Sequence, residues 1–518
     1  MDTLPVPENV RAATAADLSV LIQSAVYSAS LNQIGDALPF LARGPAGPLL
    51  CLLNADSEPL GLPLAMRPVH WRGRAAWLGQ GPTDHASAVR IRELLPFCSP
   101  VRLGTRTGAG LGDRLGLATP GHVRAVRRVP GIMPVFAQQS IREMERTERT
   151  PEQVLDDAMW GVMQEGWRSG YGADADHLKT TQDIDQCVSA GYVMYTFDPR
   201  DHVDNGAEGA DIAGLRKRYA ALPWARLATS PEQNMARYAG ESWELGGGHL
   251  LVMSELDVLR AAAKYGVALA HLRDLYEHLR AAIGGRPWEV EVSVDETDTP
   301  TRPVEHWYIA RELSRLGVEW VSLAPRYVGR FEKGVDYIGD LTAFERDWGW
   351  HVAISRALGP YKLSLHSGSD KFRIYPITAR LGGELVHLKT AGTSYLEALR
   401  TLASVDPSLF REILSFSISA YEEERRSYHV SGELSRVPDP ESLSDEQLIP
   451  LFDDLHARQV LHVAFGRVLC ARDGFGRAVF RDRMVALLRA HEEAYYRALE
   501  DHLARHLTPY ARPGRNDT

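Results

Sequence analysis

Two histidines and a carboxylate form a candidate metal site in this sequence. The stretch YKLSLHSGSDKF, residues 361–372, alternates apolar and polar side chains up to His366, which is typical of a β-strand that runs into a polar loop. His177 follows directly after Asp176 in GADADHLKT, and Glu332 lies in the glycine-containing stretch PRYVGRFEKG. Because two histidines and a carboxylate with open positions commonly hold a catalytic divalent metal, His177, Glu332 and His366 are the predicted ligands.

The segment WEVEVSVDE supplies a second set of acidic side chains. Its valines alternate with Glu289, Glu291, Ser293 and Asp295, so in a strand with the valines outward these four residues point into the protein. Buried carboxylates need a cation, a hydrogen-bond donor or a proton to offset the cost of desolvation. They are therefore either part of a salt-bridge network or a general acid or base whose pKa is raised by burial.

Polar and cationic residues at other strand ends are candidates for binding a substrate. Asp370 and Lys371 follow His366 in the same loop, Arg326 ends the segment EWVSLAPR, and Lys389 lies in LVHLKTAG. The three cations could neutralise the internal carboxylates, or they could bind a carboxylate or phosphate group of a substrate. A nucleotide site is not predicted, because the sequence has no P-loop motif and its GAGLGD does not follow a clear strand.

Alternating strand-like and helical segments predict the elements that hold these residues. Helical periodicity is clear in VEHWYIARELSRLG and LTAFERDWGWHVAISRALG, which separate candidate strands. The candidate strands are MPVFAQQS, YVMYTFDP, WEVEVSVDE, EWVSLAPR, YKLSLHSG, LVHLKTAG and RQVLHVAFG. Their order predicts a parallel sheet. With an eighth strand expected among the less periodic segments, the pattern favours a TIM-like (β/α)8 barrel of the α/β class.

The active site of such a barrel lies at the carboxyl ends of its strands, which is where the candidate residues occur. We assign the barrel to residues 126–510 and an N-terminal α+β accessory domain to residues 1–125. Within the barrel, the long segment near 201–250 is an insertion of the kind that forms lids. Residues 511–518 are expected to be a disordered tail.

Composition and charge exclude several classes of protein. The apolar fraction of 44% and the charged fraction of 24% are those of a globular protein. A net charge of −9 without a basic cluster argues against nucleic-acid binding, and no apolar run reaches the ~18 residues that a membrane span needs. The start of the chain lacks the pattern of a secretory signal and the four cysteines lie far apart, so we expect a cytoplasmic protein without disulfides. The sequence gives no indication of an oligomeric state.

Four longer strings resemble those of one enzyme family. ADADHLK, SVDET, SLHSGSDKF and VHLKTAGTSYLEALR are similar to strings of the tagaturonate epimerase family, and the similarity extends from about Gln139 to about Leu469. The resemblance implies an enzyme of hexuronate catabolism that interconverts D-tagaturonate and D-fructuronate, two ketohexuronates. It also implies dependence on a divalent metal cation, with Mn²⁺, Ni²⁺ and Zn²⁺ as candidates.

The resemblance implies roles for individual residues as well. Asp176 is the implied proton acceptor and Glu291 the implied proton donor. The implied metal ligands are His177 and His366, with Glu332 as the remaining one, and Ser140 and Thr196 match positions that shape the substrate pocket.

The chemistry of this reaction favours cleavage of a carbon–carbon bond. The two ketouronates differ at a carbon two bonds from both the ketone and the carboxylate, so neither group acidifies its hydrogen. A retro-aldol cleavage and re-addition, with Asp176 and Glu291 handling the hydroxyl proton, is therefore predicted. Two other classes of function are a barrel glycosidase with paired carboxylates and a non-catalytic sensor of sugar acids.

Overall fold

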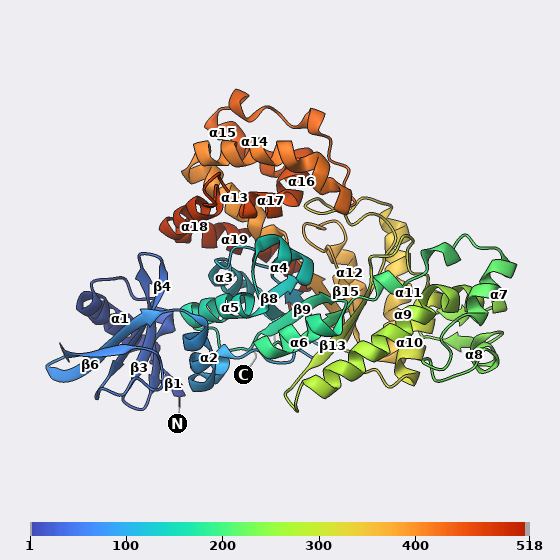
Figure 1. The fold of residues 1–518 in the computed structure, drawn as a ribbon, viewed down its shortest axis with the longest axis horizontal. Helices are drawn as coiled ribbons and strands as arrows, with labels where there is room; N and C mark the ends of the chain where they lie inside the picture. Colours follow the sequence, from blue (N-terminus) through green and yellow to red (C-terminus); the bar gives the residue numbers. More distant parts are fainter. Residues whose placement is uncertain (1–2, 513–518) are drawn as a thin grey trace.

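A closed barrel of eight parallel strands lies at the centre of the computed structural model, which describes residues 3–512 (Figure 1). Each strand pairs with its neighbours in chain order, and the ring closes between the last strand and the first. The strands are β7 (Gly108–Gly110), β8 (Met133–Ser140), β9 (Gly172–Leu178), β10 (Met194–Phe197), β13 (Glu289–Val294), β14 (Ser322–Pro325), β15 (Lys362–Leu365) and β16 (Val386–Lys389). The predicted (β/α)8 fold is confirmed.

Two barrel strands were not predicted from the sequence. β7 has three residues, two of them glycines, and so carries no apolar alternation. β9 alternates alanines, which pack into the core, with Asp174 and Asp176, which contact Lys389 inside the barrel. The predicted strand RQVLHVAFG is wrong: it forms most of α16 (Leu455–Val463), whose residues from Ala457 onward are all buried, so the helical period is hidden.

Helices follow the strands and form the outer layer of the barrel (Figure 1). They are α3 (Thr119–Arg128), α4 (Ile141–Thr147), α5 (Pro151–Glu165), α6 (Thr181–Ala190), α9 (Glu255–Ala282), α10 (Pro303–Arg315), α11 (Leu341–Leu358), α12 (Tyr375–Gly382) and α13 (Thr393–Val405). Capping boxes at Thr150 and Thr180 satisfy the first backbone N–H groups of α5 and α6, so these helices start at locally encoded positions. No helix within residues 3–512 is long and apolar enough to cross a bilayer.

The N-terminal part of the chain is a separate α+β unit beside the barrel (Figure 1). Its antiparallel sheet has the order β3 (Leu38–Gly44), β4 (Gly47–Asn54), β6 (Arg74–Pro82), β5 (Ala65–Trp71), and it is accompanied by α1 (Glu8–Ile22) and α2 (His85–Leu94). The first barrel strand, β7, falls inside the range 1–125 that was assigned to this unit. The barrel therefore begins earlier than expected.

The segment near 201–250 does not cover the barrel mouth. It forms α7 (Ile212–Ala220), α8 (Pro231–Tyr238) and the hairpin of β11 (Ser242–Glu244) and β12 (Leu250–Val252). Asn234 donates to the hydroxyl of Tyr308 at 3.1 Å and Tyr238 donates to Glu312 at 2.6 Å, so the segment is anchored on the outer helix α10.

The chain ends in a group of helices that covers one side of the barrel mouth (Figure 1). After α13 come α14 (Pro407–Glu424), α15 (Asp445–Leu448), α16, α17 (Phe465–Cys470), α18 (Arg481–Ala490) and α19 (Glu492–Leu507). α19 packs against α3 and α13 and so ties the end of the chain to the barrel. Of the predicted disordered tail, residues 511–518, only the first two lie within the described residues.

Candidate active site

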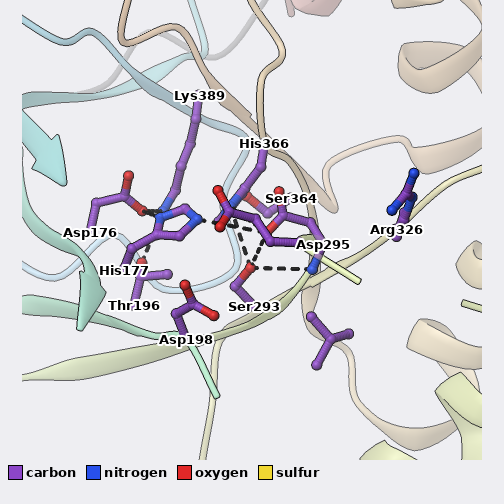
Figure 2. A network of polar contacts seen from close by, with 12 residues as sticks. Asp176, His177, Thr196, Asp198, Ser293, Asp295, Arg326, Ser364, His366 and Lys389 are labelled. Carbon is purple, nitrogen blue, oxygen red and sulfur yellow. Dashed lines mark hydrogen bonds and ion pairs between the residues drawn. The ribbon is translucent and has the colours of Figure 1, made fainter. Parts of the chain in front are cut away.

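A cavity opens at the carboxyl ends of the barrel strands. Strands β8, β9 and β16, the loops after β7, β13, β14 and β15, and helix α16 form its walls. Its lining side chains include Asp176, His177, Asp295, Lys333, His366 and Lys389. The polar residues that end successive strands therefore meet in one place, as predicted (Figure 2).

Lys389 is the centre of a buried ion-pair network at the floor of this cavity (Figure 2). Its Nζ lies 2.7 Å from Asp174 Oδ2, from Asp176 Oδ1 and from Glu291 Oε1, and it donates to Thr196 Oγ1 at 2.9 Å. Burial alone would lower the pKa of Lys389, but the three carboxylates outweigh it and raise this pKa well above its usual value. Because three carboxylates already surround the ammonium, Lys389 is an internal counter-ion and is not the cation that binds a substrate carboxylate.

The carboxylates around Lys389 differ in their pKa values. Burial would raise the pKa of Asp176 and of Glu291, but Lys389 and the neighbouring histidines hold both well below their usual values. Burial raises the pKa of Asp174 to about 6, and the negative charges of Asp176 and Glu291 act in the same direction. Asp176 and Glu291 are therefore ionised at neutral pH.

The two predicted histidines lie side by side, with ring centroids 4.9 Å apart. His177 Nδ1 donates to Asp176 Oδ1 at 2.8 Å, and His366 Nε2 donates to Glu291 Oε1 at 2.6 Å. The other two ring nitrogens face Asp295: its Oδ1 lies 3.7 Å from His177 Nε2 and 3.3 Å from His366 Nδ1. One nitrogen of each ring is thus held by a carboxylate. The other nitrogen of each ring faces the same oxygen, Asp295 Oδ1.

These donors fit a divalent transition metal. Metal-binding histidines usually donate their second ring N–H to a carboxylate or carbonyl, as both rings do here. Two imidazole nitrogens and one carboxylate oxygen are a donor set that Mn²⁺, Ni²⁺ and Zn²⁺ accept. Burial would lower the pKa of His177, but Asp176 and Asp295 outweigh it and raise the pKa to about 10. Without a metal ion, both nitrogens of this ring are therefore protonated at neutral pH and the ring is a cation.

Glu332, the predicted third ligand, lies outside this group. Its Oε2 accepts from Ser431 N at 2.9 Å, from Ser431 Oγ at 2.7 Å and from Gln459 Nε2 at 2.9 Å. The carboxylate thus joins the loop after β14 to the C-terminal helices. Asp295, which the sequence indicated only as an inward-facing carboxylate, is the carboxylate that lies toward both remaining ring nitrogens.

Asp370 and Lys371, predicted to bind substrate, line neither the cavity nor its neighbour. Asp370 forms ion pairs with Arg458 at 2.8 Å and with His502 at 2.7 Å. Lys371 Nζ donates to the backbone carbonyls of Glu332 at 2.9 Å and Ser369 at 2.8 Å. Both side chains anchor the loop after β15 to its surroundings, so their assignment to the substrate pocket is corrected.

The remaining predicted pocket residues differ in position. Ser140 lines the cavity and caps α4, with its hydroxyl accepting from Glu143 N at 3.2 Å. Thr196 lies below the cavity, inside the barrel, and donates to Asp174 Oδ1 at 2.8 Å. Arg326 lines an adjoining cavity and points away from the histidine cluster (Figure 2).

Several cavity residues were not proposed from the sequence. Arg114 enters from the loop after β7, which was not recognised as a strand, and His462 comes from α16, which was taken for one. Arg142 lies on α4, two residues past the end of β8. The signal for both arginines is a position shortly after a strand: Arg142 follows the predicted strand β8, whereas Arg114 follows β7, which the sequence did not reveal.

The fold and the site define a (β/α)8-barrel enzyme. A model of the tagaturonate epimerase family matches residues 27–509, and the chain therefore belongs to this family. It is 43% identical over 424 residues to the tagaturonate/fructuronate epimerase of Thermotoga maritima, an alignment that covers 82% of this chain and 85% of the relative. Crystal structures of the fructuronate-tagaturonate epimerase of Cohnella laeviribosi, native and with one glycerol, match with a TM-score of 0.88 and 34% identity over 97% of this chain and 99% of theirs.

Proposed function

We propose that this enzyme interconverts D-tagaturonate and D-fructuronate by retro-aldol chemistry with the help of a divalent metal ion. The observation that carries the proposal is the position of Asp176, an ionised carboxylate that lines the cavity beside both histidines. Family membership supports the substrate pair, since the relatives from Thermotoga maritima and Cohnella laeviribosi are tagaturonate/fructuronate epimerases.

The residues proposed to hold the metal ion are His177, His366 and Asp295. They offer Nε2, Nδ1 and Oδ1 respectively, while Asp176 and Glu291 orient the two rings. A divalent ion bound there would act as a Lewis acid that polarises the ketone and stabilises the negative charge developing beside it.

Metal binding to the chelator-treated protein is expected to release at least one proton at pH 8, because the pKa of His177 is raised to about 10, that of His366 is raised as well, and ligand nitrogens must be unprotonated. Calorimetry with Mn²⁺ or Zn²⁺ in two buffers of different ionisation enthalpy measures this number. Asp295→Asn should weaken binding of the metal ion by roughly 10- to 100-fold or more. This range is the usual loss when a residue that hydrogen-bonds to a metal ligand is replaced, and a ligand itself should matter no less. Glu332→Gln serves as the control and should bind the metal ion as tightly as the unmodified protein does. Weaker metal binding by Glu332→Gln than by Asp295→Asn would reject Asp295 as the ligand.

Asp176 accepts the proton of the hydroxyl group on the inverting carbon. As this proton leaves, the bond from that carbon to its neighbour nearer the ketone breaks, which gives an aldehyde fragment and an enediolate fragment. The aldehyde group turns, the same bond forms on its other face, and the new alkoxide takes up a proton. Every hydrogen bound to carbon stays where it was.

Lys389 offers the path by which this proton returns. Glu291, the donor expected from the sequence, is completely buried and does not line the cavity, whereas Lys389 does. The ammonium contacts both Asp176 and Glu291, so it can protonate the alkoxide and recover a proton from Asp176 while Glu291 holds it in place. Glu291 then acts on the substrate through Lys389.

The inverting carbon is expected to keep its own hydrogen when the reaction runs in deuterium oxide, because only the hydroxyl proton is exchanged. The test is to incubate the metal-loaded enzyme with D-fructuronate in deuterium oxide and to follow D-tagaturonate by NMR. Deuterium at the inverting carbon would exclude the retro-aldol route. Binding of fructuronate without any epimer would reject the activity itself and favour a sensor of sugar acids.

A further inference from the structure

Four lysine and arginine side chains line the cavity, and two of them form ion pairs within the protein. Lys389 is surrounded by three carboxylates at its floor. Arg142 donates from Nη2 to Glu296 Oε1 at 3.1 Å, and its guanidinium lies 5.8 Å from the ring centre of Tyr428. These two side chains therefore have partners within the protein.

Arg114 is only partly satisfied, although its side chain is almost fully buried. Its Nε donates to Glu143 Oε1 at 3.0 Å and its Nη2 to the same oxygen, while the guanidinium stacks 3.6 Å from the ring centre of Phe465. Its Nη1 is buried and finds no acceptor among residues 3–512. A buried N–H without an acceptor is costly, and the surrounding contacts hold this one rigidly in place.

Lys333 is the fourth cation, and its ammonium makes no hydrogen bond or ion pair with the part of the chain that the structure describes. It lies in the loop after β14 and lines both the main cavity and the adjoining one. Burial lowers its pKa, the positive charges of Arg142 and Arg114 act in the same direction, and Glu143 and Asp295 offset this only in part. Nearby, Glu143 is taken by Arg114, and Glu296 is shared between Arg142 and Arg200. This side of the cavity thus has an excess of positive charge.

We infer that Lys333, together with the free Nη1 of Arg114, binds the carboxylate of the sugar acid. The inference rests on the proposed function and adds an orientation: the carboxylate end lies toward Lys333 and Arg114, and the ketone end toward the histidines. The carboxylate carbon is two bonds from the inverting carbon, so a substrate held this way places the reacting hydroxyl between the cations and the ketone, in the same cavity as Asp176. Arg326 and Lys371, the cations proposed for this role from the sequence, lack such a position: the first faces the adjoining cavity and the second binds backbone carbonyls.

Lys333→Met is expected to reduce kcat/KM for fructuronate by roughly 10- to 150-fold, the range for losing a charge-assisted hydrogen bond. The neutral ketohexose that carries a hydroxymethyl group in place of the carboxylate should be converted by the variant and the unmodified enzyme at similar kcat/KM. The thermal midpoint should hardly change, because the Lys333 ammonium has no partner to lose. Lys333→Arg keeps the charge and should recover part of the activity on fructuronate.

Arg326→Met is the matched control, since it also removes a cation near the barrel mouth. It should leave kcat/KM for fructuronate close to that of the unmodified enzyme. Equal losses of Lys333→Met on the acid and on the neutral sugar would overturn the inference, and so would a loss on fructuronate confined to Arg326→Met. Failure of the unmodified enzyme to convert fructuronate at all would instead overturn the proposed function.

Discussion

Asp176→Asn is expected to lower kcat by about 10²- to 10⁴-fold, the usual contribution of a positioned proton acceptor. The carboxylate lines the cavity, and its pKa is held well below the ordinary value, so it is available as a base throughout the neutral range. An amide is close in size but cannot accept the hydroxyl proton. The measurement is the initial rate of epimer formation at saturating fructuronate, followed by NMR.

Two controls separate this loss from indirect effects. Asp201→Asn removes a carboxylate from the loop after β10, where it pairs with Lys179 on the surface, and should leave kcat unchanged. Because Asp176 also orients His177, the metal content of each variant must be measured alongside its rate. Near-normal kcat in Asp176→Asn with a full complement of metal would show that another group accepts the proton.

Lys389→Met is expected to destabilise the folded protein by about 3–5 kcal/mol, since removing one partner of a buried ion pair leaves the other charges uncompensated. Here three carboxylates, those of Asp174, Asp176 and Glu291, lose their common cation inside the barrel. Chemical denaturation of the metal-free protein at neutral pH measures the change.

The matched control for this variant is Lys333→Met. Both lysines line the same cavity, but the ammonium of Lys333 has no ion pair within residues 3–512, so its removal should cost little stability. Adding Asp174→Asn to Lys389→Met should restore part of the loss, because one of the uncompensated charges is then gone. Equal stability of Lys389→Met and Lys333→Met would contradict the role of Lys389 as the internal counter-ion.

The residues on predicted barrel strands could be placed from the sequence. Glu291 and Lys389 belong to predicted strands, and His366 directly follows one; parallel strands bring their carboxyl ends to one face. Their chain positions therefore imply that they lie close together. Asp176 lies on β9, which was not predicted, so its role came from the resemblance to the family. The inward carboxylates of WEVEVSVDE were predicted to need a cation or a donor. Lys389 meets this need for Glu291, and the backbone N–H groups of Leu103 and Gly104 meet it for Glu289.

The residues in loops could not be placed in this way. Glu332, Asp370 and Lys371 have the right chemistry and follow strands, but each is bound by a group far away in the chain or by a backbone carbonyl. Where a loop side chain points depends on these tertiary partners, which leave no local pattern. Arg114 was missed for a different reason: the strand before it, β7, has only three residues and no apolar alternation.

The closure of the barrel has a consequence for how the chain is made. β7 pairs with β8 on one side and with β16 on the other, and beside this seam the hydroxyl of Thr390 binds the carbonyl of Gly110, 280 residues earlier. During synthesis on the ribosome, the outer edge of β7 has no partner until β16 has emerged from the exit tunnel. α19, which packs against α3 next to this seam, emerges about 100 residues later still. The nascent chain therefore carries an open sheet edge until β16 has emerged, and the outer brace forms only after the ring has closed.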